Sequence, residues 1–212
     1  MLRRTLTTAI AVLVLLPASA AALPKLMPEA TVARLIGPLA PKQVITIVNS
    51  AGVQASVLAR AEFAITSQSY TLRQHWGTPL VQFGPGGWSV YLMTDVSAYC
   101  GDDADGCHSQ GPTGDVQAQV SVQVTGFPWT VVLSHEILEM LADPYIVTAP
   151  RYAGSTLVEV CDPVEFVPYT IDGVAVSDFV LPSWFQPRSQ GPFDLQHVTR
   201  FPGDTSQGSA PD

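Results

Sequence analysis

The sequence predicts a single α+β domain built on a mixed sheet, and three observations carry this prediction. The predicted elements follow the order strand, helix, strands, helix and a strand-rich remainder. Hydrophobic residues make up 47% and charged residues 13% of the chain, which excludes a disordered protein. The 212 residues are enough for one domain with a substantial core, and they contain no internal repeat.

The first half of the chain supplies a buried strand and a long N-terminal helix. The short β-branched segment 44–50 predicts the strand. Residues 53–75 place apolar side chains on one helical face and lead into a Trp-Gly-Thr-Pro sequence, which predicts the helix and its end. Segments 80–84 and 88–95 predict two more strands, and the Pro-Gly-Gly sequence between them predicts a hairpin turn.

The second half supplies a second helix and further strands. Residues 96–114 predict a polar loop, and the alternation of apolar residues in 115–126 predicts a half-buried strand. Residues 129–142 predict the second helix, which ends at an Asp-Pro pair. Segment 155–162 predicts a strand, and 169–180 predicts a hairpin with an Asp-Gly turn.

The two ends of the chain lie outside the predicted domain, which covers residues 44–200. Residues 1–22 have the layout of a secretory signal peptide, with two arginines, a short apolar run and a small-residue ending. We therefore expect an exported protein, extracellular or periplasmic, without membrane attachment after cleavage. Residues 23–43 predict a loose mature N-terminus, and residues 201–212 predict a disordered tail.

Charge and cysteine usage limit the partners. The net charge is −8, and it becomes −10 when residues 1–22, with two arginines and no acid, are removed. Such an acidic protein is not expected to bind nucleic acid or anionic membranes. Export permits disulfides, so Cys100 and Cys107, which flank a short acidic loop, are the natural pair, and Cys161 is expected to be a buried thiol.

The segment "LSHEILEMLADP", residues 133–144, carries the chemistry. It begins like HExxH, the helical zinc motif of metallopeptidases, but Glu139 replaces the second histidine. Because His135 and Glu139 are one helical turn apart, they can bind one cation together, and Asp143 lies one turn further along. The opposite face is apolar and predicts a core contact; it is formed by Leu133, Ile137, Met140 and Leu141.

A third metal ligand is expected from the segment "VEVCDPVE". Asp162 and Glu159 are equal candidates, and Glu165 is a weaker one. Zinc accepts this combination of imidazole and carboxylate ligands. An anionic ligand makes the preference for zinc less strong, so calcium stays an alternative. Glu136, beside the first ligand, is predicted to be the general base for hydrolysis.

An ordinary solvated helix face is the competing interpretation, because HExxE alone is a weak motif. Two features favour a metal site. The chain has few charges, yet acids cluster in these two segments, and neither segment contains a lysine or arginine to pair with them. Unpaired neighbouring carboxylates repel one another unless a cation or proton intervenes.

Three motifs in order, SHExLEMLxDP, EVCDxVE and SDFxxPxWF, resemble a family of phage and bacterial proteins described as zincin-like metallopeptidases. The resemblance covers roughly residues 44–200 and implies a zincin-like fold with a metal-type HExxE helix. The family carries Tyr-His at the start of its central loop, whereas Tyr99 is followed here by a cysteine. The shared positions are His135, Glu136, Glu139, Asp143, Pro144, Glu159, Cys161, Asp162, Glu165, Ser177, Asp178 and Phe179.

Together these patterns predict an exported metal-dependent hydrolase, a peptidase acting on peptides or proteins. Asp143, Glu165 and Asp178 are expected to contact the metal ligands without binding the metal. His108 is expected to be solvated in its loop, and the less favoured alternative is that it lines the site. One alternative is a non-catalytic binding or structural protein whose divalent cation, with calcium possible, ties the HExxE helix to the EVCD segment. The other is a structural protein without a metal, in which these acids are only hydrogen-bonded.

Overall fold

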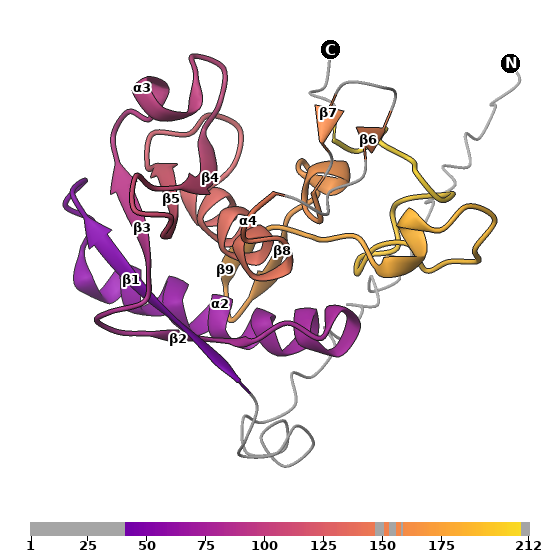
Figure 1. The fold of residues 1–212 in the computed structure, drawn as a ribbon, viewed down its shortest axis with the longest axis horizontal. Helices are drawn as coiled ribbons and strands as arrows, with labels where there is room; N and C mark the ends of the chain where they lie inside the picture. Colours follow the sequence, from indigo (N-terminus) through magenta and orange to yellow (C-terminus); the bar gives the residue numbers. More distant parts are fainter. Residues whose placement is uncertain (1–40, 147–150, 153–155, 158, 209–212) are drawn as a thin grey trace, which may run out of the picture.

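The computed structural model describes residues 41–146, 151–152, 156–157 and 159–208. The predicted signal peptide, all but the last three residues of the loose N-terminus, and residues 209–212 lie outside this part of the chain. Figure 1 shows one central sheet with two long helices packed beside it and a set of short elements after the second helix. Within the described residues, no helix is both long and apolar enough to cross a bilayer.

The sheet is mixed, which confirms the α+β class. Its five strands are β1 (Lys42–Asn49), β2 (Leu80–Phe83), β3 (Trp88–Met93), β4 (Gly106–Gln110) and β5 (Val116–Ser121), in the order β2-β1-β3-β5-β4. The pairings β1–β2, β1–β3 and β3–β5 are parallel, and only β4 runs antiparallel, at the edge beside β5.

The predicted hairpin between β2 and β3 is wrong, because both strands run parallel to β1 on its two opposite edges. The connecting residues cross β1 in very close contact. Thr46 Oγ1 lies 2.9 Å from the carbonyl oxygens of Gly84 and Gly86, to which it donates. A Cβ atom on Gly87 would lie 2.2 Å from the Val44 carbonyl oxygen, so only glycine fits at this crossing.

Both predicted helices are confirmed. The first, α2 (Ala55–Trp76), ends where Gly77 adopts a φ of 70° and donates its amide to the Arg73 carbonyl. The second, α4 (Trp129–Ala142), packs against β4, β5 and α2. The predicted apolar face of α4 is fully in the core: Leu133, Ile137, Met140 and Leu141 are all buried.

Residues 96–114 do not form the simple loop that their polarity predicts. They contain the short helix α3 (Ser97–Cys100) and the edge strand β4. The expected disulfide joins these two elements, with Cys100 and Cys107 bonded. The strand is important for the candidate site, because β4 carries His108 toward α4.

The segment after α4 also differs from prediction. Among the described residues of the predicted strand 155–162, only β7 (Thr156–Leu157), paired with β6 (Arg151–Tyr152), is strand. The chain turns instead into the 3₁₀ helix η1 (Asp162–Val164), since the proline after Asp162 cannot donate to a sheet. The predicted hairpin further on is confirmed as β8 (Tyr169–Ile171) and β9 (Val174–Val176).

Residues 201–208 are held against the domain, although the sequence predicts a disordered tail from residue 201. Asp204 is buried, its carbonyl accepts from Trp184 Nε1, and its carboxylate accepts from the amides of Arg200 and Ser206. Trp184 lies in η2 (Pro182–Phe185) and belongs to a small apolar cluster, so its hydrogen bond to Asp204 ties the tail to this part of the domain.

The crossing at Gly87 is expected to be the most substitution-sensitive point of the sheet. Gly87→Ala places a Cβ atom into backbone and should lower the free energy of unfolding by at least about 2 kcal/mol. Gly86→Ala is the matched control, because Gly86 has a similar φ of 84° but no atom within 4 Å of a new Cβ. Urea unfolding of both variants checks this; equal losses would show that φ, and not the crossing, limits position 87.

Candidate metal centre

The HExxE face of α4 is buried and faces a cavity. Glu136 and Glu139 are 5% and 3% exposed, so the competing interpretation of a solvated helix face is wrong. The cavity has a volume of about 490 Å³ and is lined by His135, Glu136 and Glu139 together with residues of other segments. Among the described residues that line it, none is lysine or arginine.

The EVCD segment, residues 159–162, reaches the same cavity and fixes the Glu139 carboxylate. The Cys161 amide donates to Glu139 Oε1 at 3.1 Å, and the Cys161 thiol donates to the His135 carbonyl at 3.8 Å. Cys161 is a buried free thiol, as predicted. With Oε1 held in this way, Glu139 Oε2 lies 3.2 Å from His135 Nε2.

Asp162 is tethered in a similar manner. Its Oδ2 accepts from the Glu159 amide at 2.8 Å, and its Oδ1 lies 3.5 Å from His135 Nε2. Glu159 points elsewhere: its Oε1 lies 3.5 Å from His108 Nε2, is buried and has no hydrogen-bond partner. The two candidates that the sequence leaves equal therefore contact different histidines.

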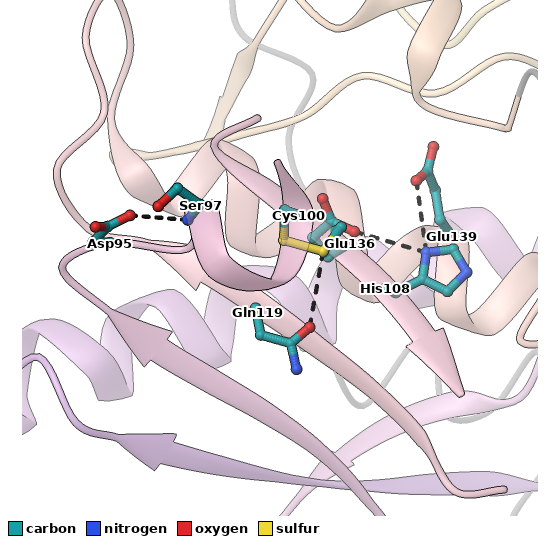
Figure 2. Close-up of a disulfide and its surroundings, with 8 residues drawn as sticks. Asp95, Ser97, Cys100, His108, Gln119, Glu136 and Glu139 are labelled. Atoms are coloured by element: carbon teal, nitrogen blue, oxygen red, sulfur yellow. Dashed lines mark hydrogen bonds and ion pairs between the residues drawn. A yellow bond between two sulfur atoms is a disulfide. The ribbon is translucent and has the colours of Figure 1, made fainter. Parts of the chain in front are cut away.

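His108 lines the cavity, which is the less favoured of the two positions that the sequence leaves open for it. Its side chain is 1% exposed, although the sequence predicts a solvated residue. In β4 it pairs with Ala118 of β5, and the Cys100–Cys107 disulfide holds the residue before it (Figure 2). The signal that could have found it is the cysteine pair itself, because a disulfide there fixes the neighbouring backbone.

Close approach of β4 to α4 brings His108 to the carboxylates. A Cβ atom on Gly106 would lie 2.6 Å from Val132 Cγ1 and 2.7 Å from Glu136 Oε1, so glycine permits this contact. Figure 2 shows His108 facing Glu136 and Glu139. The distances from His108 Nδ1 are 3.7 Å to Glu136 Oε2 and 4.0 Å to Glu139 Oε2.

The three residues expected to support the ligands are placed differently. Asp143 contributes its backbone carbonyl, 3.3 Å from His108 Nε2, and Glu165 lines the cavity. Asp178 does not line the cavity; its carboxylate accepts from the amides of Phe179 and Gln196. Burial and the neighbouring Asp194 carboxylate raise the pKa of Asp178 to about 8. Its contacts anchor the C-terminal segment.

Crowding of buried acids shifts the protonation of the site. Burial alone would lower the pKa of both histidines, but the adjacent carboxylates raise that of His108 to about 9 and that of His135 well above its usual value. Burial, partly offset by His135, raises the pKa of Glu139 to about 7. Burial and Glu139 raise the pKa of Glu159 to about 8.

Asp162 behaves in the opposite way. Burial would raise its pKa, but the contact with His135 and the Glu159 amide keeps that pKa below its usual value. Asp162 is thus ionised at neutral pH and its side chain is 39% exposed, so it is accessible as an anionic ligand. The Cys161 thiol stays protonated, because burial raises its pKa well above the usual value.

Two overlapping groups of side chains could hold a metal ion. One contains His135, Glu139 and Cys161, and the other contains His108, Glu136 and Glu139; within each group the donor atoms lie within 4.8 Å of one another. Glu139 belongs to both groups.

Comparisons of the chain with protein-family models, curated proteins and solved structures find no match.

Raised pKa values predict that the metal-free protein becomes less stable as pH rises. The folded-state pKa values of Glu139, Glu159 and His108 are about 7, 8 and 9, above the ordinary values of 4.5, 4.5 and 6.5. Between about pH 5 and 9 the folded chain therefore binds more protons than the unfolded chain, and the free energy of unfolding falls with pH.

Urea unfolding in chelator at several pH values measures this slope. Glu159→Gln removes one of the titrating groups and is expected to flatten it. Asp102→Asn, a substitution of an exposed loop acid, is the control and should leave the slope unchanged. A wild-type stability that rises from pH 5 to 9 would contradict the assignment of these shifts.

Proposed function

We propose that the protein is an exported, zincin-like, metal-dependent hydrolase that cleaves peptide bonds in peptides or proteins. The observation that carries this proposal is the placement of Glu136 beside His135 and Glu139 on one buried face of α4, open to a cavity. The zincin-like part is supported by the packing of this helix against β5 and the antiparallel edge strand β4. Export is supported by the predicted signal peptide and the disulfide.

His135, Glu139 and Asp162 suit a zinc ion. Around a tetrahedral zinc with bonds of roughly 2.0–2.1 Å, neighbouring ligand atoms lie about 3.3 Å apart. His135 Nε2 lies 3.2 Å from Glu139 Oε2 and 3.5 Å from Asp162 Oδ1. Because the second oxygen of each carboxylate is held by a backbone amide, both carboxylates are oriented toward His135. When bound, a divalent cation polarises a carbonyl and activates water as a Lewis acid.

Glu136 supplies the proton transfer. Its carboxylate accepts a proton from the water that attacks the scissile carbonyl carbon. A bond forms between the water oxygen and this carbon, the carbon–nitrogen bond breaks, and Glu136 passes the proton to the leaving amine nitrogen. His108, 3.7 Å from Glu136 Oε2, helps to hold this carboxylate on the cavity side. Transfer of this kind contributes on the order of 10²–10⁴-fold to rate.

A second candidate function has support of its own. The Cys161 amide and the Asp162 carboxylate already join the EVCD segment to α4, so a cation, calcium included, would strengthen this link without any hydrolysis. In that case a chelator lowers the melting temperature of wild type, while no peptide in a diverse library is cleaved.

Asp162 and Glu159 are expected to differ as ligands. Asp162→Asn should weaken zinc binding by about tenfold or more, because it removes an ionised oxygen that faces His135. Glu159→Gln should have a smaller effect, because Glu159 faces His108 and its pKa is about 8. Competition with a chromophoric chelator measures both affinities, and a larger loss in Glu159→Gln would reverse the assignment.

Glu136→Gln is expected to keep zinc and fold but to lose turnover by about 10²–10⁴-fold, because the amide cannot accept the proton. Cleavage of a fluorogenic peptide library, with bound zinc measured in parallel, is the test. Glu62→Gln on α2, outside the lining of the cavity, is the matched control and should keep full activity. Equal turnover of wild type and Glu136→Gln, both zinc-loaded, would disprove the role of Glu136.

A further inference from the structure

His108 has polar contacts that the proposed zinc site does not explain. Its Nε2 lies 3.3 Å from the Asp143 carbonyl oxygen and 3.5 Å from Glu159 Oε1. Both of these atoms are acceptors, so Nε2 carries a hydrogen. Metal-binding histidines commonly use one ring nitrogen in this way, donating to a carbonyl or carboxylate, and bind the ion with the other.

The other ring nitrogen faces two carboxylates. Glu136 Oε2 and Glu139 Oε2 lie 3.7 and 4.0 Å from His108 Nδ1. All three side chains are more than nine-tenths buried, and the donor atoms lie within 4.8 Å of one another. An imidazole and two carboxylates that face one another in a buried place need a positive charge between them, which either a proton or a divalent cation supplies.

We propose that His108, Glu136 and Glu139 form a second divalent-cation site, adjacent to the first and sharing Glu139 with it. The nitrogen ligand favours zinc or a similar transition metal over calcium and magnesium. The second site is the weaker one, since its ligand spacings of 3.7 and 4.0 Å exceed the roughly 3.3 Å of a tetrahedral zinc site and the side chains must contract.

Occupation of this second site has a functional consequence. A Glu136 carboxylate that binds a cation cannot also accept a proton from water. Excess zinc is therefore an inhibitor, acting through His108. This consequence rests on the proposed function, whereas the second binding event does not.

Zinc binding to the metal-free protein tests the stoichiometry directly. Calorimetric titration, with bound zinc per chain measured after gel filtration, is expected to give two sites in wild type and one in His108→Gln, with the stronger site kept. His75→Gln is the matched control, because His75 is exposed on α2 and does not line the cavity; it should keep both sites. One zinc per wild-type chain at saturation, or two in His108→Gln, overturns the proposal.

Two further measurements distinguish loss of the second site from misfolding of His108→Gln. Near-UV circular dichroism reports whether His108→Gln keeps the wild-type packing, and Glu136→Gln should independently weaken the second site by about tenfold or more. Where wild type cleaves peptides, turnover at excess zinc relative to one equivalent should fall in wild type and not in His108→Gln. An equal fall in both overturns the inhibitory role and leaves the hydrolase proposal standing.

Discussion

The buried Glu139 carboxylate is the point on which three segments of the molecule converge. Its Oε1 accepts from the Cys161 amide, and its Oε2 faces both His135 and His108. A carboxylate in an apolar interior is costly unless it is hydrogen-bonded and paired with positive charge. The helix α4, the EVCD segment and the edge strand β4 each supply part of that compensation, so none of them can move independently of the site.

The approach of β4 to α4 depends on small, local features of the chain. Gly106 lets the strand come within contact distance of Val132 and Glu136, and the disulfide fixes Cys107 next to His108. If Gly106 or the disulfide were absent, β4 would be free to lie further from α4. His108 would then contact fewer of the carboxylates that now surround it.

The protonation of the site depends on the crowding of its buried acids. In the metal-free chain, protons on Glu139, Glu159 and both histidines offset the negative charge of the crowded carboxylates, as the raised pKa values of these four groups indicate. A cation that replaces those protons couples binding to protonation and to folding. By contrast, the buried Asp178 is paired with Asp194 and backbone amides, and it stabilises the C-terminal segment without facing the cavity.

The local elements could be predicted from the sequence, since their signals lie within a few neighbouring residues. Apolar periodicity locates α2 and α4 and the strand β5, and the spacing in α4 places His135 and Glu139 on one face. The Asp-Gly turn between β8 and β9 and the Cys100–Cys107 pair were readable in the same way.

Only the tertiary structure decided how these elements meet. The crossing of β1 by residues 84–87, the burial of His108 and the different directions of Asp162 and Glu159 all depend on contacts between distant segments. Periodicity carries no information about strand order or about which elements approach one another closely. The residues of β4 were therefore predicted to lie in a polar loop. Composition and spacing alone determined which residues could bind a cation; sheet order, a glycine and a disulfide determined which of them face one another.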